Sequence, residues 1–191
     1  MKDIRKGIEM RISEKEVILK NGQVAILKSP EGEDAEQLLN YMKIMSGETN
    51  NVLRYPEEVT FTVEEERDHI INTLTDERNF DIAAFIDGKL VGNCGIFCMD
   101  TKQKIRHRTN LGIAILKDYW GIGIGDILMK HCVEQAKENG FEQIELGVIA
   151  TNKSAIALYE KYGFETYGSL KHAQKLKDGS YQDLYMMVKF L

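Results

Sequence analysis

A glycine-rich segment joins an apolar, strand-like stretch to a helical stretch near the middle of the chain. It reads LGIAILKDYWGIGIGD over residues 111–126, with glycines at positions 121, 123 and 125. Glycines let the backbone approach a ligand closely, and the first N–H groups of a helix have no partners within that helix. Because the helix dipole is positive at the same end, these N–H groups favour an anion. The segment therefore predicts phosphate binding.

The spacing of these glycines argues against two common phosphate-binding motifs. The P-loop requires G-x-x-x-x-G-K-[ST], and no lysine occupies the required place. The dinucleotide fingerprint G-x-G-x-x-G ends on Asp126 when counted from Gly121 and on Leu128 when counted from Gly123. A nucleoside triphosphatase and a Rossmann enzyme are both disfavoured. A glycine-rich turn that binds no ligand stays open as an alternative.

A second segment, NKSAIALYEKYGF over residues 152–164, follows the next strand-like run. At helical spacing Ala155, Leu158 and Tyr159 share one face, and Gly163 ends the helix. Taken alone, this pattern is typical of a short amphipathic helix with a buried tyrosine. Asn152 precedes the helix in a position where asparagine is a good cap.

The two segments together resemble the GNAT superfamily of N-acetyltransferases. In that family the glycine loop reads [QR]-x-x-G-x-[GA], and a later helix reads N-x-x-A-x-x-L-Y-x-x-x-G-F. The second pattern matches in full from Asn152 to Phe164, and the first matches at Gly123 and Gly125. Trp120 stands where the family has arginine or glutamine, so one polar contact near the phosphates is missing. The resemblance extends over about residues 23–191.

The resemblance implies that acetyl-CoA is the cosubstrate. Its pyrophosphate would lie on the backbone amides of the loop, and its pantetheine arm would pair with the backbone of Ile113 and Ile115 in a gap between two strands. Asn152 corresponds to the family asparagine near the cofactor arm. Tyr159 corresponds to the tyrosine that acts as an acid toward the leaving thiolate; the alternative is a packed core tyrosine. The loop residues so implied are Gly121, Ile122, Gly123, Ile124, Gly125 and Asp126.

The reaction that the resemblance implies is direct attack of a primary amine on the acetyl group. An alkyl ammonium has a pKa of about 10, so a base or a water chain must remove a proton. Some relatives carry a glutamate where this chain has Asn110, which cannot accept the proton. Glu145 and Asp183 are conceivable substitutes, but no base is assigned.

The acceptor is a small molecule or a protein N-terminus, and residues 41–56 and 171–183 are expected to select it. Three acidic residues in or near the first region could attract a cationic amine: Glu48, Glu57 and Glu58. The rival hypothesis is a non-catalytic acyl-CoA-binding or sensing module on the same fold, suggested by Trp120 and Asn110.

Composition restricts the partners. The 191 residues carry a net charge of −5, which disfavours nucleic acid. The chain has no apolar run of about 18 residues, and its N-terminus is charged, so we expect a cytoplasmic protein without a membrane span. Four scattered histidines and three cysteines lack metal-site spacing, and reduced thiols are expected. Homodimers are common among relatives, and pairing stays open here.

The order of elements predicts an α/β (α+β) fold of the GNAT type, with a mixed, mostly antiparallel twisted sheet of six to seven strands and about four helices. A polar lead-in over residues 1–15 precedes one N-acetyltransferase domain over 16–191. The predicted order is a strand run at 16–27 that turns at Asn21-Gly22, helices at 33–44 and from 63, strands at 80–86, 90–99 and 106–116, a helix at 127–137, a strand at 143–149, a helix at 152–162, and strands at 163–170 and 181–190.

Overall fold

In the computed structural model, which describes residues 11–191, eight strands form one sheet in the order β1-β2-β3-β4-β5-β6-β8-β7. All neighbouring strands are antiparallel except β5 and β6, which are parallel. The strands are β1 (Lys15–Ile18), β2 (Val24–Lys28), β3 (Phe80–Ile86), β4 (Lys89–Cys98), β5 (Arg108–Ile115), β6 (Gln143–Ile149), β7 (Glu165–Lys175) and β8 (Tyr181–Phe190).

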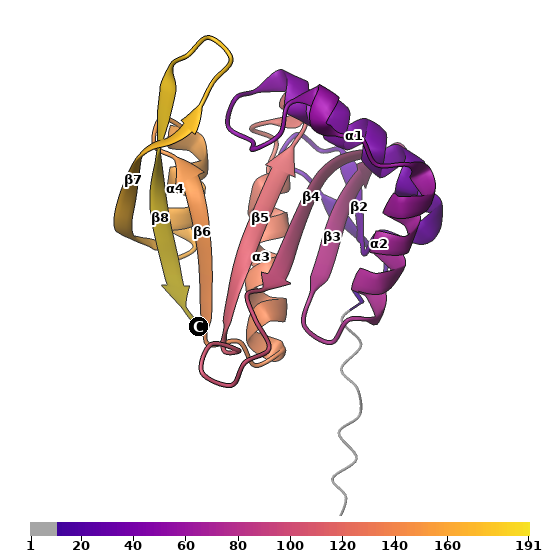
Figure 1. The fold of residues 1–191 in the computed structure, drawn as a ribbon. Helices are drawn as coiled ribbons and strands as arrows, with labels where there is room; N and C mark the ends of the chain where they lie inside the picture. The colour runs from indigo at the N-terminus through magenta and orange to yellow at the C-terminus, as the bar shows by residue number, and fades with distance from the viewer. Residues whose placement is uncertain (1–10) are drawn as a thin grey trace, which may run out of the picture.

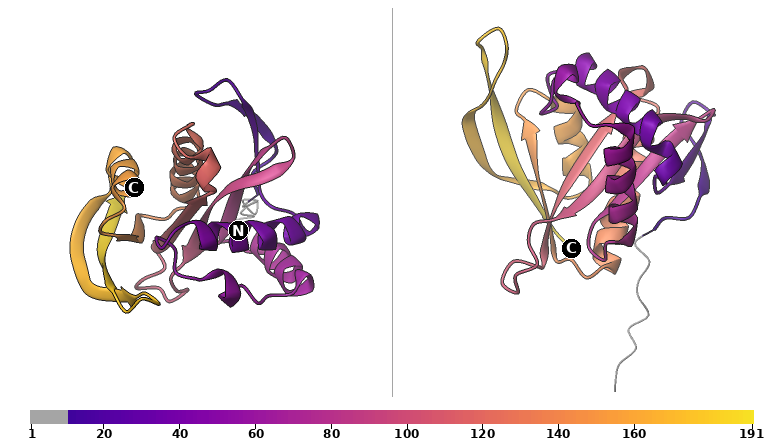
Figure 2. Two further views of the ribbon diagram at one scale, coloured as in Figure 1. Left: turned by 90° about the horizontal axis from the view of Figure 1, so that it is seen from above. Right: turned by 45° about the vertical axis from the view of Figure 1, so that its right-hand side comes forward.

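Helices cover both faces of this sheet (Figures 1 and 2). On one face lie α1 (Ala35–Glu48) and α2 (Val63–Thr75), and on the other lie α3 (Ile124–Glu138) and α4 (Lys153–Lys161). Successive side chains of a strand point to opposite faces, so each face has a hydrophobic core of its own. The α3 face carries the larger core, which includes Leu128, Ile144 and Met187.

The pairing between β5 and β6 is short. It comprises three residue pairs and ends at Asn110 and Glu145. Beyond that point β5 continues beside β4 as far as Ile115, while β6 continues beside β8 as far as Ile149. The two parallel strands therefore separate toward their carboxyl ends, as Figure 1 shows.

The mixed fold with four α-helices is confirmed, but the predicted strand count of six to seven is wrong, since the sheet has eight strands. The difference lies at the N-terminus. The run from residue 16 to 27 is a hairpin of two strands, with Gly22 at a φ of 84° in its turn. Strand β1 has four residues, three of them exposed, so its pattern does not stand out from a loop.

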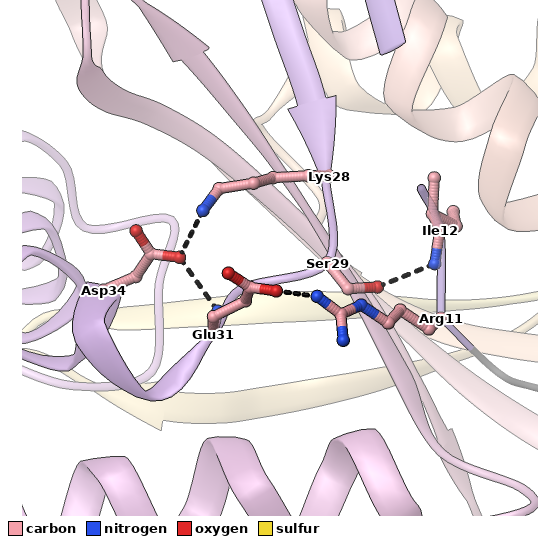
Figure 3. A network of polar contacts seen from close by, with 6 residues as sticks. All are labelled: Arg11, Ile12, Lys28, Ser29, Glu31 and Asp34. Atoms are coloured by element: carbon pink, nitrogen blue, oxygen red, sulfur yellow. Dashed lines mark hydrogen bonds and ion pairs between the residues drawn. The ribbon is translucent and has the colours of Figure 1, made fainter. Parts of the chain in front are cut away.

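The first described residues join the body of the fold through the end of β2 (Figure 3). Ile12 N donates to Ser29 Oγ at 3.0 Å, and Ser29 N donates to Ile12 O at 3.2 Å. Arg11 forms an ion pair with Glu31 in the same network. Residues 1–10 of the predicted lead-in lie outside the described part of the chain, and the domain boundary at residue 16 stays a prediction.

Two structural features are absent from residues 11–191. None of the helices in this range has the length and apolar character needed to cross a membrane. No group of three or more histidine, cysteine, aspartate or glutamate side chains in the same range is placed to hold a metal ion.

Helix α2 begins with a capping box formed by Thr62 and Glu65. Glu65 N donates to Thr62 Oγ1 at 3.2 Å, and Thr62 N donates to Glu65 Oε2 at 2.8 Å. The two contacts satisfy backbone donors that otherwise lack a partner. This cap fixes where the chain enters the helix.

We expect the substitution Thr62→Ala to lower the free energy of unfolding by about 1 kcal/mol, because it removes the side-chain acceptor of the cap. Urea denaturation followed by circular dichroism measures this change. Thr60→Ala is the matched control, since Thr60 is exposed and lies just outside the helix. Equal stability of the two variants would contradict the role of the cap.

Candidate functional site

The glycine loop turns the chain from β5 into α3. Gly121 and Gly123 adopt positive φ angles of 78° and 102°, and Gly123 is the N-terminal cap of the helix. A side chain at either position would strain the backbone. Glycine is thus required by the turn itself, in addition to any close approach by a ligand.

The start of α3 leaves backbone donors open. The first hydrogen bond of the helix runs from Ile127 N to Gly123 O at 3.2 Å, and no side chain caps the N-terminus. The N–H groups of Ile124, Gly125 and Asp126 precede this bond and lack partners within the helix. Three adjacent donors at the positive end of a helix dipole suit a pyrophosphate.

The Asp126 carboxylate would oppose an anion at this place if it were unpaired. Instead, it forms an ion pair with Lys161, and it accepts a hydrogen bond of 3.1 Å from the Tyr162 hydroxyl. The Lys161 ammonium, with a smaller contribution from the cation of Lys20, holds the pKa of this carboxyl below its usual range. The contacts turn the negative charge toward α4.

Lys20 is a candidate phosphate contact that the sequence analysis missed. It lies on the β1–β2 turn, where Lys20 N donates to Ile122 O of the glycine loop at 3.1 Å. A Cβ placed on Gly123 would lie 3.3 Å from Lys20 Cγ, so the side chain passes directly over the loop. No local pattern in the sequence indicates this contact, because about 100 residues separate the two segments.

The backbone groups of Ile113 and Ile115 lie beyond the end of the β5–β6 pairing. Leu116 N donates to Val91 O on β4 at 2.9 Å. Because backbone groups alternate in direction along a strand, those of Ile113 and Ile115 point away from β4, toward the separating β6. They have the direction that pairing with an extended arm would require.

Trp120 replaces the family's arginine or glutamine with a different contact. Its indole Nε1 donates to Ile115 O at 2.7 Å, while 47% of its surface stays exposed. The side chain thus occupies one lone pair at the end of β5. The N–H of Ile115 and both backbone groups of Ile113 remain for other partners.

Tyr159 lies on α4 and is buried in the core of the α3 face, with its ring 5.9 Å from that of Phe164. Burial, with a smaller effect of nearby Cys94, raises the pKa of its phenol well above the usual value. Within residues 11–191 no group accepts a hydrogen bond from this hydroxyl. The residue is therefore a protonated donor, as an acid role requires, and it is a core residue at the same time.

Asn152 caps α4, as its type predicts. Its side-chain oxygen accepts hydrogen bonds from Ala155 N at 3.3 Å and from Ser154 Oγ at 3.1 Å. The side-chain amide NH₂ is the part of Asn152 that can still reach a ligand. Capping and cofactor contact are therefore compatible here.

A family model, described as the acetyltransferase (GNAT) family, matches residues 48–164, which is more than half of the chain. The chain belongs to the GNAT family of acetyltransferases. The matched region includes β5, the glycine loop, α3 and α4, and it ends on Phe164.

Individual relatives agree with this family. The chain is similar to the L-amino acid N-acetyltransferase AaaT of Escherichia coli, with 35% identity over 56% of this chain and 66% of that protein. The chain spans about half the length of two further curated relatives. A GNAT acetyltransferase from Streptococcus pneumoniae superposes with a TM-score of 0.84 at 28% identity, over 87% of this chain and 99% of that one. A ribosomal-protein-alanine N-acetyltransferase from Brucella melitensis gives 0.76 at 25% identity, over 86% and 99%.

The two carboxylates considered as bases in this GNAT protein are both held by cations. Arg108 donates to Glu145 from Nε at 2.5 Å and from a terminal nitrogen at 2.8 Å, which holds the pKa of Glu145 below its usual range. Lys171 Nζ lies 2.7 Å from Asp183 Oδ2 and lowers the pKa of that carboxyl. A carboxylate stabilised in its charged form is a weak base, so the structure favours neither.

The acids expected to attract an amine are also engaged. Glu48 accepts a hydrogen bond from Lys117 N at 2.7 Å, Glu57 is paired with Lys177, and Glu58 accepts from Tyr55 N at 2.7 Å. The Lys177 contacts bring together the two regions expected to select the acceptor, since Lys177 N also donates to the Tyr55 hydroxyl at 3.1 Å. The β7–β8 hairpin and the α1–α2 connection thus meet beside the separating strands.

We expect the substitution Lys20→Ala to weaken acetyl-CoA binding about two- to fivefold, since an exposed ion pair contributes up to about 1 kcal/mol. Trp120 is the only tryptophan of the chain and lies next to the loop, so its fluorescence reports binding. Lys15→Ala, at the far end of the same hairpin, is the control. The difference in acetyl-CoA affinity between Lys20→Ala and the unsubstituted protein should shrink at high salt. Equal affinities of these two proteins at low salt would rule out the contact.

Proposed function

We propose that this GNAT protein transfers acetyl from acetyl-CoA to a primary amine by direct attack, and that residues 16–191 form the acetyltransferase domain. One observation carries the proposal: the separation of β5 from β6 lies next to the open amides of the glycine loop. An extended arm can pair with the β5 edge while its phosphate end lies at the start of α3. The relatives' names point to the same chemistry.

Each predicted site residue has a task in this reaction. The amides of residues 121–126 hold the pyrophosphate, and the backbone of Ile113 and Ile115 orients the pantetheine arm. An N–H group of the β5 edge that faces the gap also stabilises the oxyanion that forms as the amine attacks. Tyr159, on the α4 side, donates a hydrogen bond to the sulfur as it leaves. Its raised pKa keeps the phenol protonated throughout the physiological range.

The proposed acceptor is the amine of an amino acid or of a protein N-terminus. AaaT is named for L-amino acids, and the Brucella protein is named for ribosomal-protein alanine. In both classes the nucleophile is a primary α-amine. A non-catalytic sensor on the same fold is disfavoured, because the relatives are named as N-acetyltransferases and Tyr159 retains its hydroxyl.

The direct experiment mixes the purified protein with acetyl-CoA and a panel of L-amino acids, peptides with N-terminal alanine, and polyamines. Free thiol release is followed with a dye, and mass spectrometry identifies the acetylated product. Reactions without protein and without amine are the controls. We expect amine-dependent release with at least one α-amine. Acetyl-CoA binding without turnover would support the sensor instead, and absence of binding would refute the acetyl-CoA assignment.

We expect the substitution Tyr159→Phe to lower kcat about 100-fold, the lower end of the range for loss of an acid catalyst. The affinity for acetyl-CoA should stay within about twofold, because the ring remains in the core. Tyr185→Phe is the matched control, since Tyr185 packs against the same core. If both variants kept the rate of the unsubstituted protein, Tyr159 would be a packing residue only.

A further inference from the structure

A carboxylate interrupts the otherwise apolar strand β3. The strand reads FDIAAFI, and Asp81 is its charged residue. Removing a carboxylate from water is costly unless a cation or several hydrogen bonds compensate for it. Within residues 11–191 its side-chain partner is Asn93 Nδ2 at 3.5 Å, and none of the ion pairs includes it. Packing alone gives no reason for a charge at this position.

Asp81 is one end of a row that crosses the sheet. In the strand register Asp81 lies opposite Gly95 on β4, and Gly95 lies opposite Gly112 on β5. Paired residues point to the same face, which here is the α1 and α2 face. The row therefore consists of a carboxylate followed by two positions without side chains.

The missing side chains leave space that other groups occupy. A Cβ on Gly95 would overlap Asp81 Oδ1 and would lie 2.8 Å from Phe97 Cζ. A Cβ on Gly112 would lie 3.6 Å from Phe97 Cε2. The Asp81 carboxylate thus lies over Gly95, and the Phe97 ring lies over both glycines. We name this row of Asp81, Gly95 and Gly112, covered by Phe97, the glycine trough.

The glycine trough ends at the separation of β5 from β6. Gly112 is two residues beyond Asn110, where the pairing of these strands stops. Adjacent strands lie about 5 Å apart, so a carboxylate over Gly95 is about one strand spacing from Gly112. A small amine that displaced the Phe97 ring from this place would contact the carboxylate and would lie at the opening between β5 and β6. Phe97 is 41% exposed, so its ring forms the outer cover of this row.

We propose that the glycine trough is the binding site of the acceptor's ammonium group, and that Asp81 is the base that takes its proton. The proposal rests on the proposed function and adds the residue that accepts the proton and the path of the amine. With the Phe97 ring turned aside, an unbranched carbon next to the amine would lie over Gly112, where no side chain is present.

The electrostatic environment suits this role. Burial raises the pKa of Asp81 to about 6, and the hydrogen bond from Asn93, with a smaller electrostatic effect of His69, limits the rise. The raised pKa of Asp81 lies closer to the pKa of an alkyl ammonium, which is about 10. Desolvation lowers the pKa of the ammonium and so reduces the difference between the two pKa values further. Five residues from the surrounding elements interact electrostatically or by a hydrogen bond with Asp81. They are Asn93 from β4, His69 and Glu66 from α2, Tyr41 from α1, and Cys132 from α3.

The proton balance is simple. The Asp81 carboxylate takes one proton from the ammonium and becomes a neutral acid. The amine nitrogen then uses its freed lone pair to form a bond with the acetyl carbon, and the carbon–sulfur bond breaks. The sulfur leaves as a thiolate that Tyr159 stabilises by a hydrogen bond until solvent protonates it. Asp81 returns its proton to solvent, and a second proton leaves the amide nitrogen.

The test compares Asp81→Asn with the unsubstituted protein, using the best amine from the panel. We expect kcat/KM to fall at least 100-fold at pH 7.5. In the unsubstituted protein kcat/KM should rise with pH, with an apparent pKa near 6. This rising limb of the pH profile should be absent in the variant. Affinity for acetyl-CoA, read from Trp120 fluorescence, should not change.

A melting curve excludes misfolding as the cause. The folded pKa of Asp81, about 6, exceeds the ordinary value of 3.8 for an aspartate carboxyl. The ionised carboxylate therefore destabilises the fold, and its effect grows as pH rises from about 4 to 6 and is complete above that range. The Asn variant should accordingly melt at or above the temperature of the unsubstituted protein at pH 8.

The variant Gly112→Ala tests the path of the amine. Its Cβ would meet Phe97 at an ordinary contact distance, so the fold should persist, but the trough would be narrowed. We expect the KM for the amine to rise about tenfold with unchanged acetyl-CoA affinity. Gly168→Ala is the control, because a Cβ there meets nothing within 4 Å.

A second measurement separates this proposal from the proposed function. Free CoA and the amine together form a complex that cannot react, and the amine should raise its melting temperature in an Asp81-dependent way. Turnover that survives Asp81→Asn with its pH limb intact would overturn the base and leave the acetyltransferase function standing. Asp81-dependent amine binding without turnover would support the ammonium site and count against the base. Neither turnover nor amine binding would overturn both proposals.

Discussion

The end of the pairing between β5 and β6 is the constraint on which the rest of this structure depends. Three residue pairs hold the strands together, and the last one lies beside the Arg108–Glu145 ion pair. Glu145 is almost fully buried, so this bidentate contact holds the two strands at the point where they begin to diverge. The ion pair therefore has a structural role. It also makes Glu145, which lies beside the opening between β5 and β6, a weak base.

The separation gives the sheet two chemically different faces that meet at one opening. The α3 face supplies the glycine loop, the helix amides and Tyr159, all suited to an anionic cosubstrate with a thiol leaving group. The α1 face supplies the glycine trough and Asp81, suited to a cationic acceptor. Because β5 borders the opening, groups on both faces can reach it without a large movement of the fold. In the proposed reaction, the opposite charges of the two substrates would thus match opposite faces of one sheet.

Local patterns predicted the parts of the site that depend on local structure. The glycines, the caps at Thr62 and Asn152, and strands such as β3 and β6 follow from spacing within a few residues. The contact of Lys20 and the engagement of Glu145 depend on pairing between distant segments, so no local signal reveals them. The eighth strand, β1, pairs with its neighbour β2 in a local hairpin, but its four residues are mostly exposed and give little apolar signal. Asp81 is an intermediate case, because an acid within the run FDIAAFI is a signal that sequence analysis can detect.

The departure of this chain from the family pattern at Trp120 has a structural counterpart. An arginine or glutamine at this position would offer a polar group to the phosphates, whereas the indole N–H is used by Ile115 O. A cation reaches the loop from the β1–β2 turn instead, since Lys20 lies over Gly123 and is joined to Ile122 through the backbone. In the proposed complex with acetyl-CoA, the hairpin at the edge of the sheet would thereby be part of the cosubstrate site. Its sequence would then bear on binding as well as on folding, although it lies outside the region that the family model matches.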